Sequence, residues 1–311
     1  MNMPIETTET IWMDGELVPW EEARVHVLTH ALHYGGGVFE GIRAYRTAQG
    51  VAVFRLGDHI DRLLGSAKIL MMDVPFSHRR LVDATRQLIR VNHLDQGCYV
   101  RPIIFFGYGE MGLNTMPCSA SVAIAAWPWG TYLGEEGISK GVRMKVSSWQ
   151  RHDPNAIPTA AKITGMYVNS SLAKVEALKA GYDEAILLAP DGKVSECTGE
   201  NIFVVKKGRI LTPHVSQVGA LSGITMDSVE TIASDLGYTV SHEPLIRTDF
   251  YLGSEAFLAG TAAEVVPIVE VDDRVVGDGK PGPITREIQS TYMAACHGEL
   301  ERYKDWLDYV E

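Results

Sequence analysis

The sequence has 311 residues, of which 46% are hydrophobic and 22% charged, with a formal net charge of −11. This length suits two domains of ordinary size, and the composition is that of a folded globular protein. The acidic balance argues against a general nucleic-acid binder, and no apolar run reaches the length of a membrane span. The start lacks the basic and apolar regions of a signal peptide. Four dispersed cysteines without a CxxC pair predict free thiols in a reducing cytoplasm and no metal site. The profile as a whole fits small-molecule metabolism best.

The first part of the chain predicts strands with helices between them. An Asp14-Gly15 turn between apolar flanks predicts a hairpin within residues 10–18. Apolar spacing predicts helices over 58–71 and 81–92, and apolar runs predict strands over 51–55, 98–106 and 121–127. The motif Trp127-Pro128-Trp129-Gly130 then ends the last strand. We therefore expect a first domain over 1–130, a linker over 131–140 and a larger second domain over 141–311.

The second part predicts another sheet with helices. Strands are expected over 144–149, 185–189, 193–195, 201–205, 209–211, 257–259 and 265–271. A helix is expected over 165–180, with an apolar face of Val168, Leu172, Val175 and Leu178, and another over 224–236, stopped by Gly237. The pattern predicts two domains of the α+β class.

Lys162 is the first candidate for chemistry, because it stands alone among small and apolar residues in Ala160-Ala161-Lys162-Ile163. A lysine just before a helix is usually solvated at the end of a strand. Desolvation would instead make its amine a better nucleophile, as Schiff-base chemistry requires. Glu196, between a short strand and a Gly turn, is either a surface carboxylate or an acid aimed at a pyridine nitrogen.

Two Gly-Thr turns are candidates for binding phosphate. Leu221-Ser222-Gly223-Ile224-Thr225 opens a predicted helix, whose first backbone amides suit an anion, although Ser222 could simply be an N-cap. Ala259-Gly260-Thr261-Ala262 follows a predicted strand. Neither turn fits the dinucleotide or nucleotide loops GxGxxG and GxxxxGK[ST].

Taken in order, these motifs resemble the branched-chain amino acid aminotransferases, members of the fold-type IV pyridoxal-phosphate enzymes. The resemblance runs from about Ile11 to Trp306, and further matching motifs lie at 30–35, 38–43, 54–55 with Arg62, 99–102, 128–130 and 158–162. It implies a two-domain fold like that of D-amino acid aminotransferase, with pyridoxal 5′-phosphate at the domain interface. The implied reaction passes the amino group of L-leucine, L-isoleucine or L-valine to 2-oxoglutarate by a ping-pong mechanism.

The resemblance also implies roles toward the cofactor. Lys162 would form the Schiff base and shuttle the proton, and Glu196 would pair with the pyridine nitrogen. Arg62 would hold the phosphate, although a helix-surface arginine beside Asp58 and Asp61 is the alternative. The remaining cofactor contacts would be Tyr167 at the 3′-oxygen, Leu221 on the ring face, and Gly223, Ile224, Thr225 and Thr261 around the phosphate.

The substrate pocket implied by the resemblance must accept both an aliphatic side chain and the carboxylate of glutamate. Its walls would be Tyr34, Phe39, Trp129, Tyr132 and Tyr167. Arg101 would receive the distal carboxylate of glutamate, while Tyr99 and the amides of Thr261 and Ala262 would bind the α-carboxylate. The loop 109–113 resembles one that closes over the pocket of a neighbouring subunit, which implies a homodimer at least and leaves a hexamer open.

Several readings stay open at this point. D-amino acid aminotransferases, (R)-amine transaminases and aminodeoxychorismate lyases share the fold and the lysine, so the fold alone does not choose among them. The motifs 99–102 and 128–132 favour the branched-chain group. A cofactor-free scaffold that retains the fold is the reading from a different class. The sequence does not indicate which branched-chain substrate is preferred.

Overall fold

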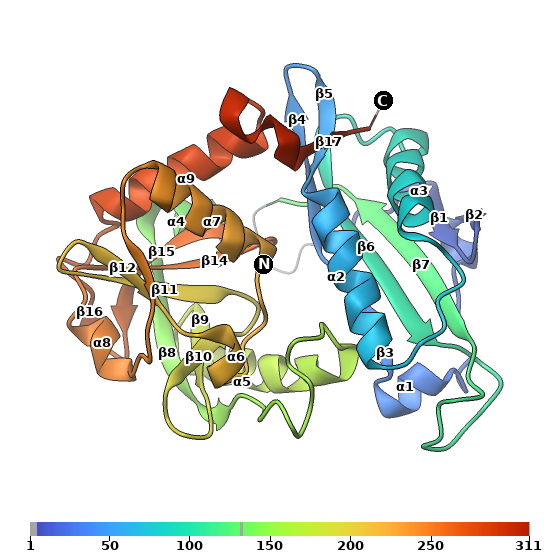
Figure 1. Ribbon diagram of the computed structural model, residues 1–311, viewed down its shortest axis with the longest axis horizontal. Coiled ribbons are helices and arrows are strands. Elements are labelled where there is room, and N and C mark those ends of the chain that lie inside the picture. Colours follow the sequence, from blue (N-terminus) through green and yellow to red (C-terminus); the bar gives the residue numbers. More distant parts are fainter. Residues whose placement is uncertain (1–4, 131–132, 311) are drawn as a thin grey trace. The chain divides into compact units, whose positions relative to one another are not determined.

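The computed structural model describes residues 5–130 and 133–310, which fold as two compact units (Figure 1). The first unit contains Met1–Gly130, Ala161–Met166 and Ala295–Glu311, and the second contains Thr131–Ala160 and Tyr167–Ala294. This division differs from the expected one, because the segment around Lys162 and the C-terminal segment both belong to the first unit. Residues expected as a linker lie in the second.

Backbone pairing explains the difference. Ile163 bridges to Val38 of the first unit, and β17 (Leu307–Tyr309) pairs antiparallel with β5 (Gly50–Phe54). The expected linker instead contains α4 (Gly134–Lys140), whose carbonyls at Ile138 and Ser139 accept hydrogen bonds from side chains of the second unit. Contacts distant in sequence, rather than local composition, therefore set the boundaries.

The first unit is built on a sheet with the strand order β17-β5-β4-β6-β7-β1-β2, to which β3 adds by pairing with β6. The predicted hairpin is confirmed, with positive φ at both Asp14 (48°) and Gly15 (105°) as a tight hairpin turn requires. Besides β5 and β17, the strands of the first unit are β1 (Thr10–Met13), β2 (Glu16–Pro19), β3 (Gly37–Phe39), β4 (Ile42–Thr47), β6 (Gly97–Phe106) and β7 (Ala120–Trp127). The hairpin consists of β1 and β2.

Two predicted helices of this unit are confirmed within a few residues, as α2 (Leu56–Ile69) and α3 (His78–Val91). Each buries its apolar face, with Leu63 of α2 and Leu88 of α3 fully enclosed, and both lie along the sheet in Figure 1. The shorter helical segments are η1 (Trp20–Glu22), α1 (His30–Tyr34), η2 (Thr164–Met166) and η3 (Glu301–Trp306).

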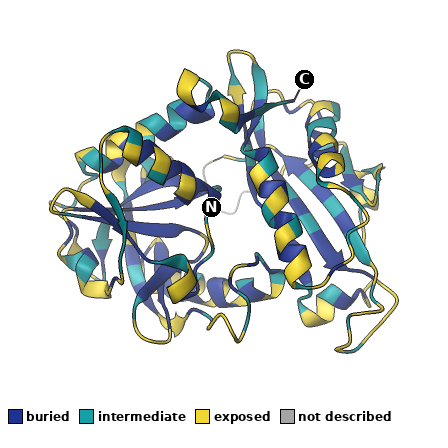
Figure 2. Ribbon diagram, viewed as in Figure 1, coloured by how far each residue is buried: buried dark blue, intermediate teal, exposed yellow. Residues whose placement is uncertain are grey.

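The second unit has a mixed sheet in the order β10-β9-β8-β15-β14-β11-β12-β13, with β16 paired to β15. Four of its strands, β9, β10, β11 and β14, are almost wholly buried (Figure 2). The strands of this unit are β8 (Val142–Gln150), β9 (Glu184–Leu188), β10 (Val194–Cys197), β11 (Asn201–Lys206), β12 (Arg209–Thr212), β13 (Val240–His242), β14 (Glu255–Gly260), β15 (Glu264–Val271) and β16 (Arg274–Val275). Its helices are α4, α5 (Tyr167–Lys179), α6 (Val215–Val218), α7 (Ile224–Asp235), α8 (Arg247–Tyr251) and α9 (Pro283–Cys296).

The helix α5 corrects one prediction. It begins two residues later than expected, and its apolar stripe does not pack on the sheet, since Val168 is 64% exposed and Leu178 53% exposed. The buried face consists of small and polar residues, including Ala173 and Ala177, which pack with Ala185 of β9. Small side chains let the helix approach the strands closely, whereas the β-branched and leucine face points outward.

Across the described ranges, no helix combines the length and apolar character needed to cross a bilayer.

Candidate active site

The backbone of Lys162 is held on both sides. Its amide donates to Ser66 Oγ of α2 at 3.1 Å, and its carbonyl accepts from the amide of Phe39 at 3.1 Å. Thr164 Oγ1 donates to the Gly35 carbonyl at 2.9 Å, which anchors the following turn. The Cα of Lys162 is therefore fixed beside β3, within reach of the Phe39 ring.

Two cationic side chains approach that ring. Lys162 Nζ lies 5.1 Å and Arg101 Cζ 4.8 Å from the centroid of Phe39, distances at which a cation is attracted by the aromatic face. Arg101 Nη2 donates to the Tyr99 hydroxyl at 3.0 Å, and Tyr99 packs edge-on against Trp129 with 4.3 Å between centroids. The structure thus brings five of the predicted residues together.

Two details of this cluster suit ligand recognition. The Nε of Arg101 is buried and has no hydrogen-bond partner in the described part of the chain. A buried guanidinium N–H left unpaired is costly, so this donor suits an anion. A Cβ at Gly41 would collide with the hydroxyl of Tyr99, so the absence of a side chain there lets Tyr99 reach its position.

Arg62 has a partner that the sequence analysis did not identify. Its Nε and Nη2 donate to Glu40 Oε1 and Oε2 at 2.6 and 2.8 Å, and His59 Nδ1 lies 2.8 Å from Oε2. Burial alone would raise the pKa of the fully enclosed Glu40, but the charge and hydrogen bonds of Arg62 and His59 hold that pKa well below its usual range. Burial lowers the pKa of His59, against the opposing effect of Glu40. Arg62 is therefore a fixed cation, not a surface arginine beside Asp58 and Asp61.

One predicted substrate residue, Tyr34, stands apart from this cluster. The side chain of Tyr34 is 46% exposed, and its ring packs against His30 at 4.6 Å and His33 at 6.3 Å between centroids. The expected role of Tyr132 falls outside the described residues.

In the second unit, Glu196 is the centre of a buried polar network. It lies in β10 beside a register shift, and both it and Arg151 are nearly enclosed, with side chains 8% and 6% exposed. Arg151 Nη2 contacts Oε1 at 2.7 Å, and the amide of Leu221 donates to Oε2 at 2.9 Å. Both carboxylate oxygens are thereby oriented by donors from different segments.

The N-terminus of α7 follows directly from Leu221. Gly223 is the N-cap residue and offers no side-chain cap, so Ser222 does not occupy that position. Asn201 Nδ2 donates to the Leu221 carbonyl at 2.9 Å. The N-terminus of a helix, with the positive end of its dipole, is suited to an anion.

Further predicted residues of the second unit lie at the ends of elements. The hydroxyls of Thr225 and Thr261 are 3.4 Å apart, so the start of α7 meets the end of β14. Ala262 follows Thr261 in the turn before β15, and the half-buried Tyr167 is the first residue of α5. The two Gly-Thr turns identified in the sequence therefore form one polar corner.

A second carboxylate network lies near Glu196. Glu184 is fully buried, accepts from Thr198 Oγ1 at 2.7 Å and pairs with Lys174 Nζ at 2.6 Å. Burial, together with the charge of Glu184, raises the pKa of Glu200 to about 8. Burial and the neighbouring carboxylate therefore favour the protonated form of Glu200. No sequence pattern pointed to this network, because its members are separated along the chain.

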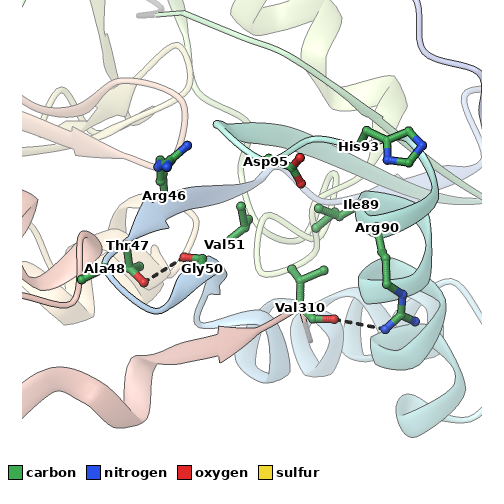
Figure 3. Close-up of a pocket in the computed structure, with 10 residues that line it drawn as sticks. All are labelled: Arg46, Thr47, Ala48, Gly50, Val51, Ile89, Arg90, His93, Asp95 and Val310. Carbon is green, nitrogen blue, oxygen red and sulfur yellow. Dashed lines mark hydrogen bonds between the residues drawn. The ribbon is translucent and has the colours of Figure 1, made fainter.

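A surface hollow of the first unit lies elsewhere (Figure 3). Its lining includes Arg46, Arg90, His93 and Asp95, and none of its residues is a predicted site residue. The polar clusters around Lys162 and Glu196 are therefore the candidates for chemistry.

Comparison with known proteins identifies the family. The model of the family described as amino-transferase class IV matches residues 37–271. The chain belongs to this family. A branched-chain-amino-acid aminotransferase of Pseudomonas aeruginosa is 46% identical over 301 residues, covering 97% of each chain. The sequence resemblance and the two-domain α+β fold expected from it are confirmed.

Solved structures agree with the assignment of this chain to the aminotransferase family. The Escherichia coli branched-chain amino acid aminotransferase superposes with a TM-score of 0.95 at 46% identity, covering 98% of this chain and 100% of that one. The T.th. branched-chain amino acid aminotransferase complexed with N-(5′-phosphopyridoxyl)-L-glutamate has a TM-score of 0.92 at 44% identity, covering 98% and 99%.

Proposed function

We propose that this aminotransferase is a pyridoxal-phosphate-dependent branched-chain enzyme that passes the amino group of L-leucine, L-isoleucine or L-valine to 2-oxoglutarate. The observation on which this chiefly rests is the anchored Lys162, whose amine lies over Phe39 beside Arg101. The curated and solved relatives named above are branched-chain aminotransferases, and one of them binds an adduct of the cofactor with glutamate.

The residues present fit the cofactor. In the second unit, the N-terminus of α7, with its glycine N-cap, and the neighbouring hydroxyls of Thr225 and Thr261 suit a phosphate, and Gly223 and Ile224 would supply backbone amides. Glu196 offers an oriented carboxylate for the pyridine nitrogen, and Leu221 and Tyr167 would contact the ring and its 3′-oxygen. In the first unit, Arg62 is the cation for the phosphate and Lys162 the amine.

When bound, pyridoxal phosphate supplies an electron sink that stabilises charge at the substrate α-carbon. The chain's own residues do the rest. Lys162 Nζ would take the proton from the substrate α-carbon and deliver it to the former aldehyde carbon of the cofactor, and its anchored backbone would keep it in place between the two transfers. Glu196, by holding a negative charge, favours a proton on the ring nitrogen.

Substrate choice follows from the cluster around Phe39. Phe39 and Trp129 supply apolar surface for a branched side chain, while Tyr99 and the Thr261 and Ala262 amides would bind the α-carboxylate. The buried, unpartnered Nε of Arg101 suits the distal carboxylate of glutamate. One arginine next to apolar walls would allow both substrates to use the same pocket.

A donor panel tests the proposal. The purified enzyme is assayed with 2-oxoglutarate and either L-leucine, D-alanine or (R)-1-phenylethylamine, and its visible spectrum is recorded before turnover. We expect a yellow protein that prefers L-leucine and loses its band and activity in Lys162→Ala. Preference for D-alanine or the amine would assign it to the rival groups of the same fold. A colourless protein unaffected by Lys162→Ala would be a scaffold.

We also propose a homo-oligomer in the cytoplasm. The loop near Met111 and Leu113 exposes these two side chains by 46% and 86%, which favours contact with a second copy. The free cysteines, three of them buried, suit a reducing compartment. Light scattering after size exclusion would distinguish monomer, dimer and hexamer.

A further inference from the structure

Arg151 is a buried arginine directly after β8 that no sequence motif indicated. Its amide donates to the Leu188 carbonyl at 2.8 Å, and its side chain is only 6% exposed. A buried guanidinium requires partners, because its desolvation is costly. The partners of Arg151 must therefore compensate for the cost of burying its charge.

Its contacts connect two segments. Nη2 pairs with Glu196 Oε1 at 2.7 Å, and Nε donates to the Gly219 carbonyl at 3.4 Å. Gly219 has a φ of +67°, and a Cβ there would meet the His152 carbonyl at 2.7 Å, so this turn packs tightly against the residue after Arg151. Arg151 thus links Glu196 to the turn that leads into Leu221.

The surroundings of Glu196 make a cation necessary. Glu184 and Glu200 are buried nearby, and Lys174 is the partner of Glu184. After burial and the charge of Glu184, the charge of Glu196 also contributes to raising the pKa of Glu200. Burial, followed by the neighbouring carboxylates including Glu196, raises the pKa of Cys197. A second negative charge in this region is unfavourable unless a cation compensates it. Arg151 is the residue in ion-pair contact with Glu196.

We propose that Arg151 is a positioning residue for the cofactor: it keeps Glu196 ionised and oriented, and so sets the protonation of the cofactor's ring nitrogen. This inference rests on the proposed function. The ion pair that would control the charge on the ring nitrogen, Arg151 with Glu196, lies entirely within the second unit. Without Arg151, the buried carboxylate of Glu196 would lose the cation that contacts it, and this loss favours uptake of a proton. Protonated Glu196 would then resemble a glutamine.

The test compares Arg151→Met, Arg151→Gln, Arg151→Lys, Glu196→Gln and the double variant Arg151→Met/Glu196→Gln, each loaded with cofactor. The control is Arg209→Met, which removes an arginine paired with Glu243 at the surface. Three quantities are measured: the pH titration of the visible band, the cofactor dissociation constant, and kcat and KM for L-leucine.

We expect Arg151→Met and Arg151→Gln to give the same shifted spectrum as Glu196→Gln, with kcat reduced about 10- to 100-fold. KM for leucine should stay within about twofold, since the change acts on the ring. The double variant should be no slower than the worse single variant, because both changes remove the same effect, the negative charge of Glu196 beside the ring nitrogen. Arg151→Lys should recover most of the spectrum, and Arg209→Met should match wild type.

A wild-type spectrum and kcat in Arg151→Gln, or losses that multiply in the double variant, would overturn the proposal. A lower melting temperature with an unchanged spectrum would do the same, since it would show a purely structural role. If Arg151→Met does not fold, Arg151→Gln decides the question. Its amide can still donate a hydrogen bond near Glu196, which helps the variant to fold, whereas the positive charge is gone. Failure of the proposed function is a separate outcome, in which the wild-type protein itself shows neither a visible band nor transfer from leucine.

Discussion

Arg62 and Glu40 form a two-pronged ion pair, with donor–acceptor distances of 2.6 and 2.8 Å, around a carboxylate that is fully buried. Such a pair fixes the guanidinium in a single orientation. The proposed phosphate ligand is thereby preorganised on α2 by a residue 22 positions earlier in the chain. Binding then requires little further ordering of this side chain.

Glu40→Gln tests how much the Arg62–Glu40 ion pair contributes to stability and to cofactor binding. We expect a loss of about 3 kcal/mol in the free energy of unfolding, because the change leaves a largely buried arginine uncompensated. The cofactor should also bind more weakly. Urea unfolding and cofactor titration measure both effects. Asp58→Asn is the control, since the Asp58 side chain is 50% exposed and the loss of its charge should cost less than about 1 kcal/mol. Equal effects of the two changes would contradict this view.

Glu200 predicts an unusual dependence of stability on pH. Its folded pKa of about 8 lies above the unfolded value of about 4.3. The protonated carboxyl therefore stabilises the fold fully below pH of about 4.3, and this contribution is lost as the pH rises through about 8. Glu200→Gln mimics the protonated form. Its free energy of unfolding should equal that of wild type near pH of about 4, and should be a few kcal/mol higher than that of wild type at pH of about 9.

Urea unfolding of both proteins across this pH window measures the difference. The matched control is Glu243→Gln, because Glu243 is 40% exposed and pairs with Arg209 at the surface. Parallel stability curves for wild type and Glu200→Gln would show that Glu200 is ionised in the folded protein.

Local patterns in the sequence predicted much of the fold. The Asp14-Gly15 turn, the helices α2, α3 and α7, and the long strands β6 and β7 follow from turn chemistry and apolar periodicity. The same reasoning failed for α5, because periodicity identifies an apolar face without showing what covers it. Strands of three residues, such as β17, have too few residues for a pattern, and they form because a distant strand offers an open edge.

The site shows the same division. Lys162 and Glu196 stood out through their motifs, and in the structure the side chains of Lys162 and Arg101 both approach the ring of Phe39. Arg151 gave no signal, because its partner Glu196 is 45 positions further along the chain. Glu40 did offer one, since an acid within the apolar stretch Val38-Phe39-Glu40-Gly41-Ile42 must have a buried partner.

Arg101→Ala should separate the two substrates. Only glutamate brings a second carboxylate, so its kcat/KM should fall about 100-fold, while that for leucine should change less than about threefold. Steady-state kinetics with both donors measure the ratio. Arg46→Ala is the control, because Arg46 lines the separate surface hollow and should change neither value. Similar losses on both substrates would make Arg101 a structural residue.

Gly41→Ala tests whether the position of Tyr99 matters for substrate binding. The added Cβ would collide with the Tyr99 hydroxyl, which must then move away from Arg101. Because small misplacements of a positioning group are costly, we expect kcat/KM to fall about 100-fold for leucine and glutamate alike.

The control for this change is Gly65→Ala within α2, where a Cβ would meet no atom within 4 Å. It should leave kinetics unchanged and stabilise the helix by about 0.5 to 1 kcal/mol, since alanine is the better helix former. Kinetics and urea unfolding of both variants are measured together. Full activity in Gly41→Ala would mean that Tyr99 can move without loss, and its role at the α-carboxylate would have to be abandoned.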